Sequence, residues 1–338
     1  MRAFAKGVVA AAAVAAIATT TAVAEEIKEL NWGILAVESQ DNLMKRWGPI
    51  IEAMEVKTGI KINPFFATDY TGVIEAMRFD KVDLVLFGNK SAMTAVDRAG
   101  AEVFAQMIET DGSKGYHSIL VTHKDNDEIN SLEDVLATCS AQSLDFGIGD
   151  PQSTSGFLVP TTFIFAAHDV NPRDCFNTVR NASHEANLLS VANKQVDVAT
   201  ANNRALYFRL KRNKPEAAEQ IKEIWRSPLI AADPMAWRAD LPEEVKAKIL
   251  YAFMSFGRLG SIEEVKEERA ILQNGGFMGF VPSSNAQLLP FREMEANKQI
   301  LQIQSDETLS AAEKEERIAE QKAKIEEVRA LVKDVPSM

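Results

Sequence analysis

The sequence predicts an α/β protein built from two domains, with a helical segment at its C-terminus. Strand-like apolar runs alternate with helix-like segments through most of the chain, which implies parallel strands with helices packed on the sheet. The chain has 338 residues, and the roughly 314 that follow an N-terminal leader suit two domains of ordinary size. Residues 296–338 differ from the rest because charged side chains dominate there.

Each expected element follows from a local pattern and from its turn residues. The first strand, 30–35, is followed by apolar residues at helical spacing, such as Leu43 and Trp47, until Gly59 ends the helix. Ser131 is typical of a helix N-cap. The other expected strands are 60–66, 82–87, 116–123, 144–148 and 196–200, with extended stretches at 221–225 and 232–237, and the other expected helices cover 69–77, 91–98, 157–168 and 188–194.

The N-terminus has the three-part plan of a secretory signal peptide. Arg2 and Lys6 precede an apolar run from residue 8 to 17, and Ala22-Val23-Ala24 is an A-x-A cleavage site. The run is shorter than the roughly 20 residues that span a bilayer. We therefore expect a signal peptide over residues 1–24, cleavage after Ala24 and export of the remainder.

Charge and cysteine content limit the functions that are open to the chain. The net charge is −11, and loss of Arg2 and Lys6 with the leader would make it about −13. So acidic a chain is a poor partner for nucleic acid, and any site for an anion must be built locally. The two cysteines, Cys139 and Cys175, either form a disulfide in an oxidising compartment or remain separate thiols.

The C-terminal segment reads as a helix that packs on another helix. Ser310 and Glu313 form a capping box, after which Ile318, Ile325 and Val328 lie on a narrow stripe that continues to Val332. Such a stripe either covers the helix's own domain or forms the contact of a homodimer.

An anion site is expected at Ser153-Thr154-Ser155-Gly156, between a predicted strand and a predicted helix. The first backbone N–H groups of a helix have no internal partners, and the helix dipole is positive there. Three hydroxyls add donors, and Gly156 allows a ligand to approach closely, so the turn suits a phosphate, phosphonate, sulfate or carboxylate. The alternative is that the hydroxyls only cap the helix.

The motifs of common enzyme classes are missing, so we expect no catalytic residue, metal or cofactor. The turn lacks the Gly-Lys-Ser/Thr ending of a Walker A loop, and no Gly-x-Ser-x-Gly elbow is present. A triad of Ser153 or Ser155 with His184 and Asp197 or Asp233 would rest on scattered residues alone. The histidines, at positions 117, 123, 168 and 184, show no metal spacing.

A family resemblance covers nearly the whole chain after the leader. The sequence resembles the periplasmic phosphonate-binding proteins of ABC importers, the PhnD family. The segments that carry the resemblance are Trp32-Gly33-Ile34 with Glu38-Ser39-Gln40, Phe65 to Tyr70, Met77-Arg78-Phe79, Gly88-Asn89 with Ser91-Ala92-Met93, Ala95 to Ala99, Gly149 to Pro160, His184-Glu185, Val191 to Thr200, Trp225 to Ile230, and Asp233-Pro234.

The resemblance implies a two-lobed periplasmic binding protein fold of type II, with the ligand in the cleft between the lobes. Lobe 1 would comprise residues 25–120 and 231–295, lobe 2 residues 121–230, and a helical extension residues 296–338. The crossing segments would lie near 119–123 and 228–237. The implied partners are a phosphonate or phosphate analogue and an ABC permease of the inner membrane, and the implied location is the periplasm.

The resemblance also implies roles for individual residues. Asp233 would hold the amine of an aminoalkylphosphonate, because an ammonium favours a carboxylate partner. Phe87 stands where the family often has a Tyr whose hydroxyl reaches the phosphonate, and Arg204 falls where well-known members carry a second amine-holding Glu. The residues expected to hold the phosphonate oxygens are Tyr70, Ser153, Thr154, Ser155 and His184.

Arg204 reverses the charge beside the ligand's tail, unless its side chain points outward. We therefore expect a ligand other than 2-aminoethylphosphonate, namely methylphosphonate, phosphite, phosphate or a phosphonate with a carboxylate tail. The other functions that remain open are a binding protein of the same fold for another small anion or a thiamine precursor, an exported hydrolase of phospho-compounds, and a sensor that docks on a receptor.

Overall fold

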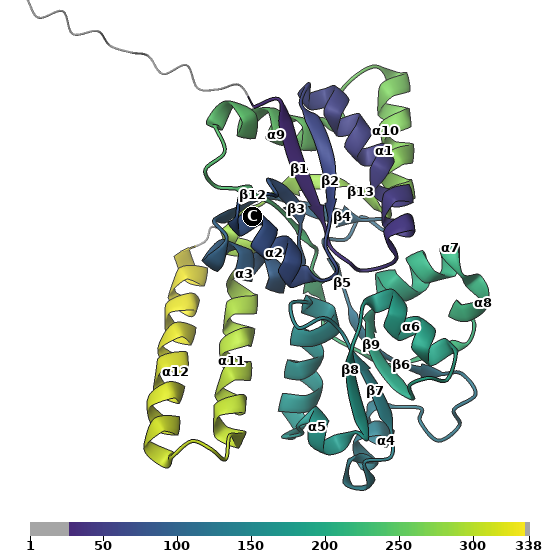
Figure 1. The fold of residues 1–338 in the computed structure, drawn as a ribbon, viewed down its shortest axis with the longest axis vertical. Coiled ribbons are helices and arrows are strands. Elements are labelled where there is room, and N and C mark those ends of the chain that lie inside the picture. The colour runs from purple at the N-terminus through teal and green to yellow at the C-terminus, as the bar shows by residue number, and fades with distance from the viewer. Residues whose placement is uncertain (1–26, 335–338) are drawn as a thin grey trace, which may run out of the picture.

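The computed structural model describes residues 27–334 and has two α/β lobes, each built around its own sheet (Figure 1). The sheet of lobe 1 has six strands in the order β13-β4-β12-β3-β1-β2. Its strands are β1 (Glu29–Ile34), β2 (Lys61–Phe66), β3 (Leu84–Leu86), β4 (Ala101–Glu109), β12 (Pro234–Arg238) and β13 (Phe277–Pro282). Its helices are α1 (Gln40–Thr58), α2 (Tyr70–Arg78), α3 (Asn89–Arg98), α9 (Glu243–Ser255) and α10 (Ile262–Gly275).

Lobe 2 has a five-stranded sheet in the order β10-β6-β9-β7-β8. Its strands are β6 (Ser118–His123), β7 (Asp145–Ile148), β8 (Thr178–Asn181), β9 (Val198–Asn202) and β10 (Ile221–Arg226). Its α-helices are α4 (Leu132–Ala137), α5 (Pro172–Cys175), α6 (His184–Ala192), α7 (Lys211–Asn213) and α8 (Pro215–Ala218). Three π-helical segments, Thr154–Leu158, Thr161–Phe165 and Ala205–Leu210, complete the lobe with short 3₁₀ turns at Cys139–Ala141 and Ala166–His168.

The expectation of parallel strands holds for only part of each sheet. β1 pairs in parallel with β2 and β3, and β7 pairs in parallel with β8 and β9. By contrast, β12 runs antiparallel to β3 and β4, and β6 runs antiparallel to β9 and β10. The antiparallel strands adjoin the segments in which the chain passes between the lobes, so they enter their sheets from the opposite end.

A short ribbon joins the two lobes. In it β5 (Gly115–Tyr116) pairs antiparallel with β11 (Ile230–Ala231). The whole of β6 belongs to the second sheet, so the crossing expected at 119–123 occurs a few residues earlier, and the boundary expected at residue 120 falls inside a strand of lobe 2. Tyr116, Ile230 and Phe291 pack together in a small core beside the ribbon.

Aromatic packing and helix caps stabilise lobe 1. Trp32 lies 5.5 Å, centroid to centroid, from both Trp47 and Phe253, so strand β1 is packed against two helices by large buried rings. Ser39 caps α1 by accepting a hydrogen bond from the backbone N–H of Asn42, and Gly59 ends the helix with a left-handed φ of 67°. The predicted cap at Ser131 is confirmed, with a full capping box.

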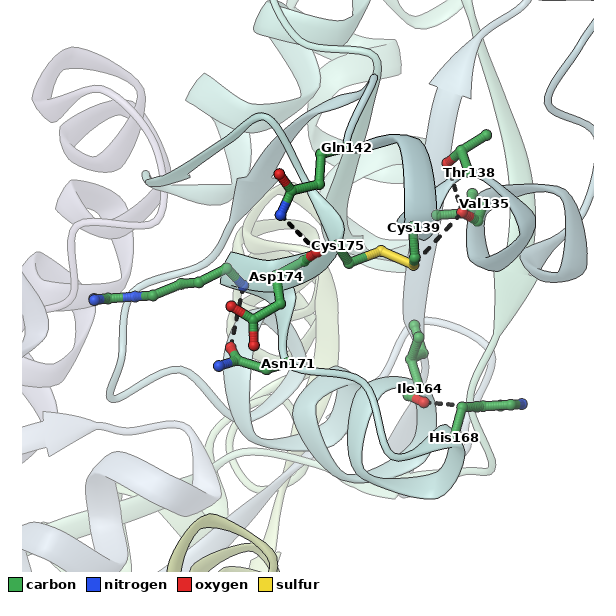
Figure 2. The surroundings of a disulfide bond; sticks show 10 residues. Val135, Thr138, Cys139, Gln142, Ile164, His168, Asn171, Asp174 and Cys175 are labelled. Carbon is green, nitrogen blue, oxygen red and sulfur yellow. Dashed lines mark hydrogen bonds between the residues drawn. A yellow bond between two sulfur atoms is a disulfide. The ribbon is translucent and has the colours of Figure 1, made fainter. Parts of the chain in front are cut away.

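A disulfide between Cys139 and Cys175 joins the turn after α4 to the end of α5 (Figure 2). The sequence left this pairing open. Beside it, the Gln142 side chain donates a hydrogen bond to the backbone oxygen of Asp174. The two turns that cover one edge of lobe 2 are therefore held together by both a covalent bond and a hydrogen bond.

The C-terminal segment is a helical hairpin. It consists of α11 (Leu289–Ser305), preceded by a 3₁₀ turn at Asn285–Leu288, and α12 (Ala311–Asp334), which packs along α11 beside the two lobes (Figure 1). The capping box of Ser310 and Glu313 is confirmed. Ile325 and Val328 are buried, whereas Val332 is exposed, so the expected stripe packs on a helix of its own chain.

Candidate ligand-binding cleft

A cleft between the lobes is lined by residues from both of them and from the joining ribbon. Lobe 1 contributes Tyr70 and Gly88, the ribbon contributes Tyr116, and Asp233 lies just before β12. Seven of the eight residues expected at the site line this cleft: Tyr70, Ser153, Thr154, Ser155, His184, Arg204 and Asp233.

The turn Ser153–Gly156 follows β7 and opens a π-helical segment. Ser153 is its N-cap, and the Ser153 hydroxyl accepts a hydrogen bond from the backbone N–H of Gly156 at 3.0 Å. Ser155 Oγ accepts a hydrogen bond from the Asn202 side chain at 3.2 Å. The three hydroxyl-bearing side chains are almost fully buried, so this turn presents preorganised donors to the cleft.

Close backbone packing fixes the position of this turn. The backbone N–H of Gly149 donates a hydrogen bond to the carbonyl oxygen of Gly156 at 2.9 Å. A Cβ atom at Gly149 would lie 2.5 Å from the Cα of Gly156, a distance that no packed pair of carbons tolerates. Glycine is therefore required at position 149 if the turn is to keep its position.

The first residues of two α-helices also line the cleft beside the Ser153–Gly156 turn. Tyr70 is the first residue of α2 and His184 is the first residue of α6, and both side chains are buried. His184 Nε2 lies 3.5 Å from Ser153 Oγ, while its Nδ1 has no hydrogen-bond partner in the described part of the chain. The site therefore gathers the positive ends of three helical segments around one point.

Burial sets the protonation states of these two side chains. It raises the pKa of Tyr70, so the hydroxyl stays protonated and can donate. Burial, together with the charges of Arg209 and Arg204, lowers the pKa of His184 to about 3. His184 is thus a neutral imidazole at pH 7, with one N–H to donate to an oxyanion.

Arg204 points into the cleft rather than outward. Its guanidinium pairs with Glu109 Oε1 at 3.0 Å and with Asp233 Oδ2 at 2.5 Å, and it lies 3.7 Å from the centroid of the Tyr116 ring. Burial lowers the pKa of Arg204, but the two carboxylates raise it by more, so the net shift is upward. Asp233, which the family resemblance assigns to a ligand amine, is therefore already engaged by a cation of the protein.

Burial also shifts the pKa of Glu109. Desolvation raises its pKa to about 7, against the opposing effect of Arg204, so this carboxyl is partly protonated near neutral pH. Glu109 ends β4 in lobe 1, whereas Arg204 follows β9 in lobe 2. The ion pair between them therefore also holds the two lobes together.

Phe87 is the expected site residue that the structure does not bring to the cleft. Its side chain is fully buried in the core of lobe 1, among residues of α2 and α3, so the expectation that its ring faces a ligand is wrong. Tyr116 of the joining ribbon does line the cleft, and burial raises its pKa well above 10. Sequence analysis also missed Arg46, Glu109, Asn202 and Arg209, which line the cleft as well.

Hydrogen bonds between the lobes show that the cleft is closed. The backbone N–H of Lys90 donates to Thr154 Oγ1 at 2.9 Å, and that of Ser39 donates to Glu185 Oε2 at 2.7 Å. Further hydrogen bonds between the lobes include Tyr70 N to Asp150 Oδ2 at 3.3 Å, Thr94 Oγ1 to Gln152 Oε1 at 2.8 Å and Arg212 Nη1 to the Asn274 carbonyl at 2.7 Å.

Within residues 27–334, no helix is both long and apolar enough to cross a membrane. The leader expected at residues 1–24 lies outside the described part of the chain.

Comparison with known proteins identifies relatives along most of the chain. Residues 32–288 match the family model described as the periplasmic substrate-binding protein of phosphonate ABC transporters. The phosphonates-binding periplasmic protein of Escherichia coli is 46% identical over 307 residues, which cover 91% of this chain and 88% of the relative. A phosphate-import protein of Mycolicibacterium smegmatis is 28% identical over 68% of this chain and 72% of its own length.

Solved structures agree with the sequence relatives. A binding-protein component of an ABC phosphonate transporter from Pseudomonas aeruginosa has a TM-score of 0.86 at 42% identity, over 91% of this chain and 99% of the other. A protein of Prochlorococcus marinus in complex with methylphosphonate has a TM-score of 0.69 at 21% identity, over 81% and 100%, which shows a shared fold. The chain belongs to the family of periplasmic substrate-binding proteins of phosphonate ABC transporters.

Proposed function

We propose that this protein binds a phosphonate, or the related phosphite or phosphate, in the interlobe cleft and delivers it to an ABC permease of the inner membrane. The observation that carries the proposal is the convergence of the helical N-termini at Tyr70, Ser153 and His184 on one closed cleft. Their donors suit a tetrahedral oxyanion, which offers only acceptors when fully ionised.

Capture would proceed by closure of the cleft. In an open form the donors of lobe 2, on the Ser153–Ser155 turn and His184, would be separated from Tyr70 of lobe 1. A ligand that bonds to both lobes favours the closed form, in which Thr154 also accepts a hydrogen bond from the backbone of Lys90. The permease would then recognise the closed form.

The ligand's tail is the point at which this protein would differ from binders of aminoalkylphosphonates. An ammonium tail needs a free carboxylate, but Asp233 already pairs with Arg204, and so does Glu109. Displacing Arg204 would leave a buried guanidinium without a partner, which is costly. We therefore propose that methylphosphonate, phosphite, phosphate or a carboxylate-tailed phosphonate binds more tightly than 2-aminoethylphosphonate.

Isothermal titration of the protein without its leader tests this assignment. Methylphosphonate, phosphite, phosphate, a phosphonocarboxylate and 2-aminoethylphosphonate would be compared in one buffer. We expect at least one of the first four to bind more tightly than the aminoethyl compound. No binding of any of the five would contradict the proposed function, and tightest binding of 2-aminoethylphosphonate would contradict the proposal about the tail.

Two finer points belong to the same proposal. Cleavage after Ala24 would release the chain into the periplasm, and the mass of the N-terminal peptide of the exported protein tests this. The second is a homodimer through the C-terminal hairpin, for which the exposed Leu331 and Val332 near the end of α12 supply apolar surface. Sedimentation of the wild type and of Leu331→Glu would show whether that surface joins two copies.

A further inference from the structure

Arg209 is a buried cation that forms no ion pair within residues 27–334. It lies in the π-helical segment Ala205–Leu210, lines the cleft and has only 8% of its surface exposed. Its Nη2 atom is buried without a hydrogen-bond partner, and across residues 27–334 no carboxylate lies within ion-pair distance of its guanidinium. A buried charge in this condition is unfavourable unless something else supplies the opposite charge.

The other cations of the cleft are already neutralised. Arg46 Nη2 lies 3.1 Å from Glu38 Oε1, and Arg204 is paired with both Glu109 and Asp233. Glu38 is the carboxylate whose charge most raises the pKa of Arg209, but Glu38 is already paired with Arg46. Glu185 lines the same small cavity as Glu38 and Arg209, but it is paired with Lys214 at 3.4 Å. Arg46 and Arg209 therefore share Glu38, and neither nearby carboxylate forms an ion pair with Arg209.

The expected oxyanion donors provide no charge of their own. Serine, threonine and tyrosine hydroxyls are neutral, and the low pKa of His184 keeps its imidazole neutral as well. A phosphonate resembles a phosphate monoester, which carries a charge of about −1.5 to −2 at pH 7. Neutral donors orient such an anion, but a guanidinium adds charge-assisted and bidentate hydrogen bonds.

We propose that Arg209 is the counter-ion of the bound ligand, so that its guanidinium pairs with an oxyanion group of the ligand in the closed cleft. The inference rests on the proposed function, because it takes the ligand to be a phosphonate or a close analogue. Arg204, the N-cap of the segment Ala205–Leu210, is paired with the protein's own carboxylates, whereas Arg209, five residues later, is left for the ligand. The oxyanion is either the phosphonate group itself or a carboxylate on the tail.

Calorimetric titration of four proteins would test the role of Arg209. The wild type, Arg209→Gln, Arg209→Lys and Lys211→Gln would each be titrated with methylphosphonate and with 3-phosphonopropionate. Lys211 is a matched control because it is exposed and lies two residues away, so its substitution removes the same charge from the same region. We expect Arg209→Gln to weaken binding at least about tenfold, Arg209→Lys to recover part of the loss, and Lys211→Gln to have little effect.

Comparing the two ligands shows whether Arg209 pairs with the phosphonate group or with a tail carboxylate. An equal loss for both would assign Arg209 to the phosphonate group, and a loss confined to 3-phosphonopropionate would assign it to the tail carboxylate. Unchanged affinity of Arg209→Gln for every ligand that the wild type binds would overturn the proposal. Failure of the wild type to bind any phosphonate, phosphite or phosphate would instead contradict the proposed function.

Thermal unfolding without ligand gives an independent readout. If Arg209 has no partner in the protein, Arg209→Gln removes an uncompensated buried charge, and its melting temperature should equal or exceed that of the wild type. Arg46→Gln breaks the pair with Glu38 and should melt lower. A clear drop in the melting temperature of Arg209→Gln would mean that the guanidinium is already paired within the protein, which would overturn the proposal even if no ligand were found.

Discussion

Replacing Arg204 by Gln should increase the affinity for ligands with an ammonium tail relative to ligands without one. The substitution keeps a polar side chain, although a shorter one, and removes the cation between Glu109 and Asp233. Both carboxylates would then face the cleft without a partner of their own. A ligand such as 2-aminoethylphosphonate could supply the missing cation, whereas methylphosphonate could not.

The size of the effect follows from the two ion pairs. Removing one partner of a buried pair costs about 3–5 kcal/mol, and we expect the low end, about 3 kcal/mol, because Asp233 remains 15% exposed and Glu109 can take up a proton. A hydrogen bond to a charged group contributes about 1.5–3 kcal/mol. An ammonium that restores one such bond should therefore raise the preference for 2-aminoethylphosphonate over methylphosphonate by a factor of about 10 to 140.

The assay is a pair of titrations on the wild type and Arg204→Gln, with Lys211→Gln as the control for charge. The quantity compared is the ratio of the two dissociation constants within each protein, so a general loss of affinity cancels. Thermal unfolding of the free proteins provides the stability change. Because the Arg204–Glu109 pair joins the lobes, the variant should also populate the open form more than the wild type does.

Two results would refute this reasoning. If the ratio were the same in the wild type and in Arg204→Gln, Asp233 would not be available to the ligand's tail even when it is unpaired. If the wild type already bound 2-aminoethylphosphonate far more tightly than methylphosphonate, Arg204 would not exclude an ammonium at all.

Three further predictions concern stability and the oxyanion turn. Reduction of the Cys139–Cys175 disulfide, which closes 36 residues, should lower the free energy of unfolding by about 3–4 kcal/mol, whereas equal denaturation midpoints with and without reductant would contradict this. The pKa of His184 is depressed to about 3, so its contribution to stability is present above pH 6.5 and is lost as the pH falls toward 3. The free energy of unfolding of His184→Asn, measured by denaturant titration, should therefore fall less steeply with decreasing pH than that of the wild type. Gly149→Ala should weaken phosphonate binding measurably, because its Cβ would displace Gly156, while Gly48→Ala, whose Cβ would meet only Met44 Cε at 3.9 Å, should bind as the wild type does; equal affinities would mean that the turn is not the site.

Local patterns predicted the helix start at the Ser153–Gly156 turn well. Ser153 was expected at a helix start after a strand, and the structure has it as the N-cap of the segment that follows β7. The signal was local, because a strand end, three hydroxyl residues and a glycine are adjacent in the sequence. The tail region could not be predicted in this way. Arg204 and Glu109 are 95 positions apart and come from different lobes, so nothing near either residue indicates the ion pair.

The error at Phe87 has a geometric cause. The side chains of a strand alternate between the two faces of its sheet, and the sequence does not say which face meets the cleft. Phe87, just after β3, turns toward the core under α2 and α3. Tyr116, an aromatic residue of the cleft that was not expected, lies in the two-residue strand β5 of the joining ribbon, which is too short to show any periodicity.

We propose that the Ser153–Ser155 turn, Tyr70 and His184 together bind one oxyanion between the closed lobes. A crystal structure of the protein with methylphosphonate tests it most directly. We expect phosphonate oxygens within about 3.2 Å of the hydroxyls of the turn, the Tyr70 hydroxyl and a ring nitrogen of His184. A phosphonate held elsewhere, or a bound form in which the lobes are apart and Tyr70 does not contact the ligand, would contradict it.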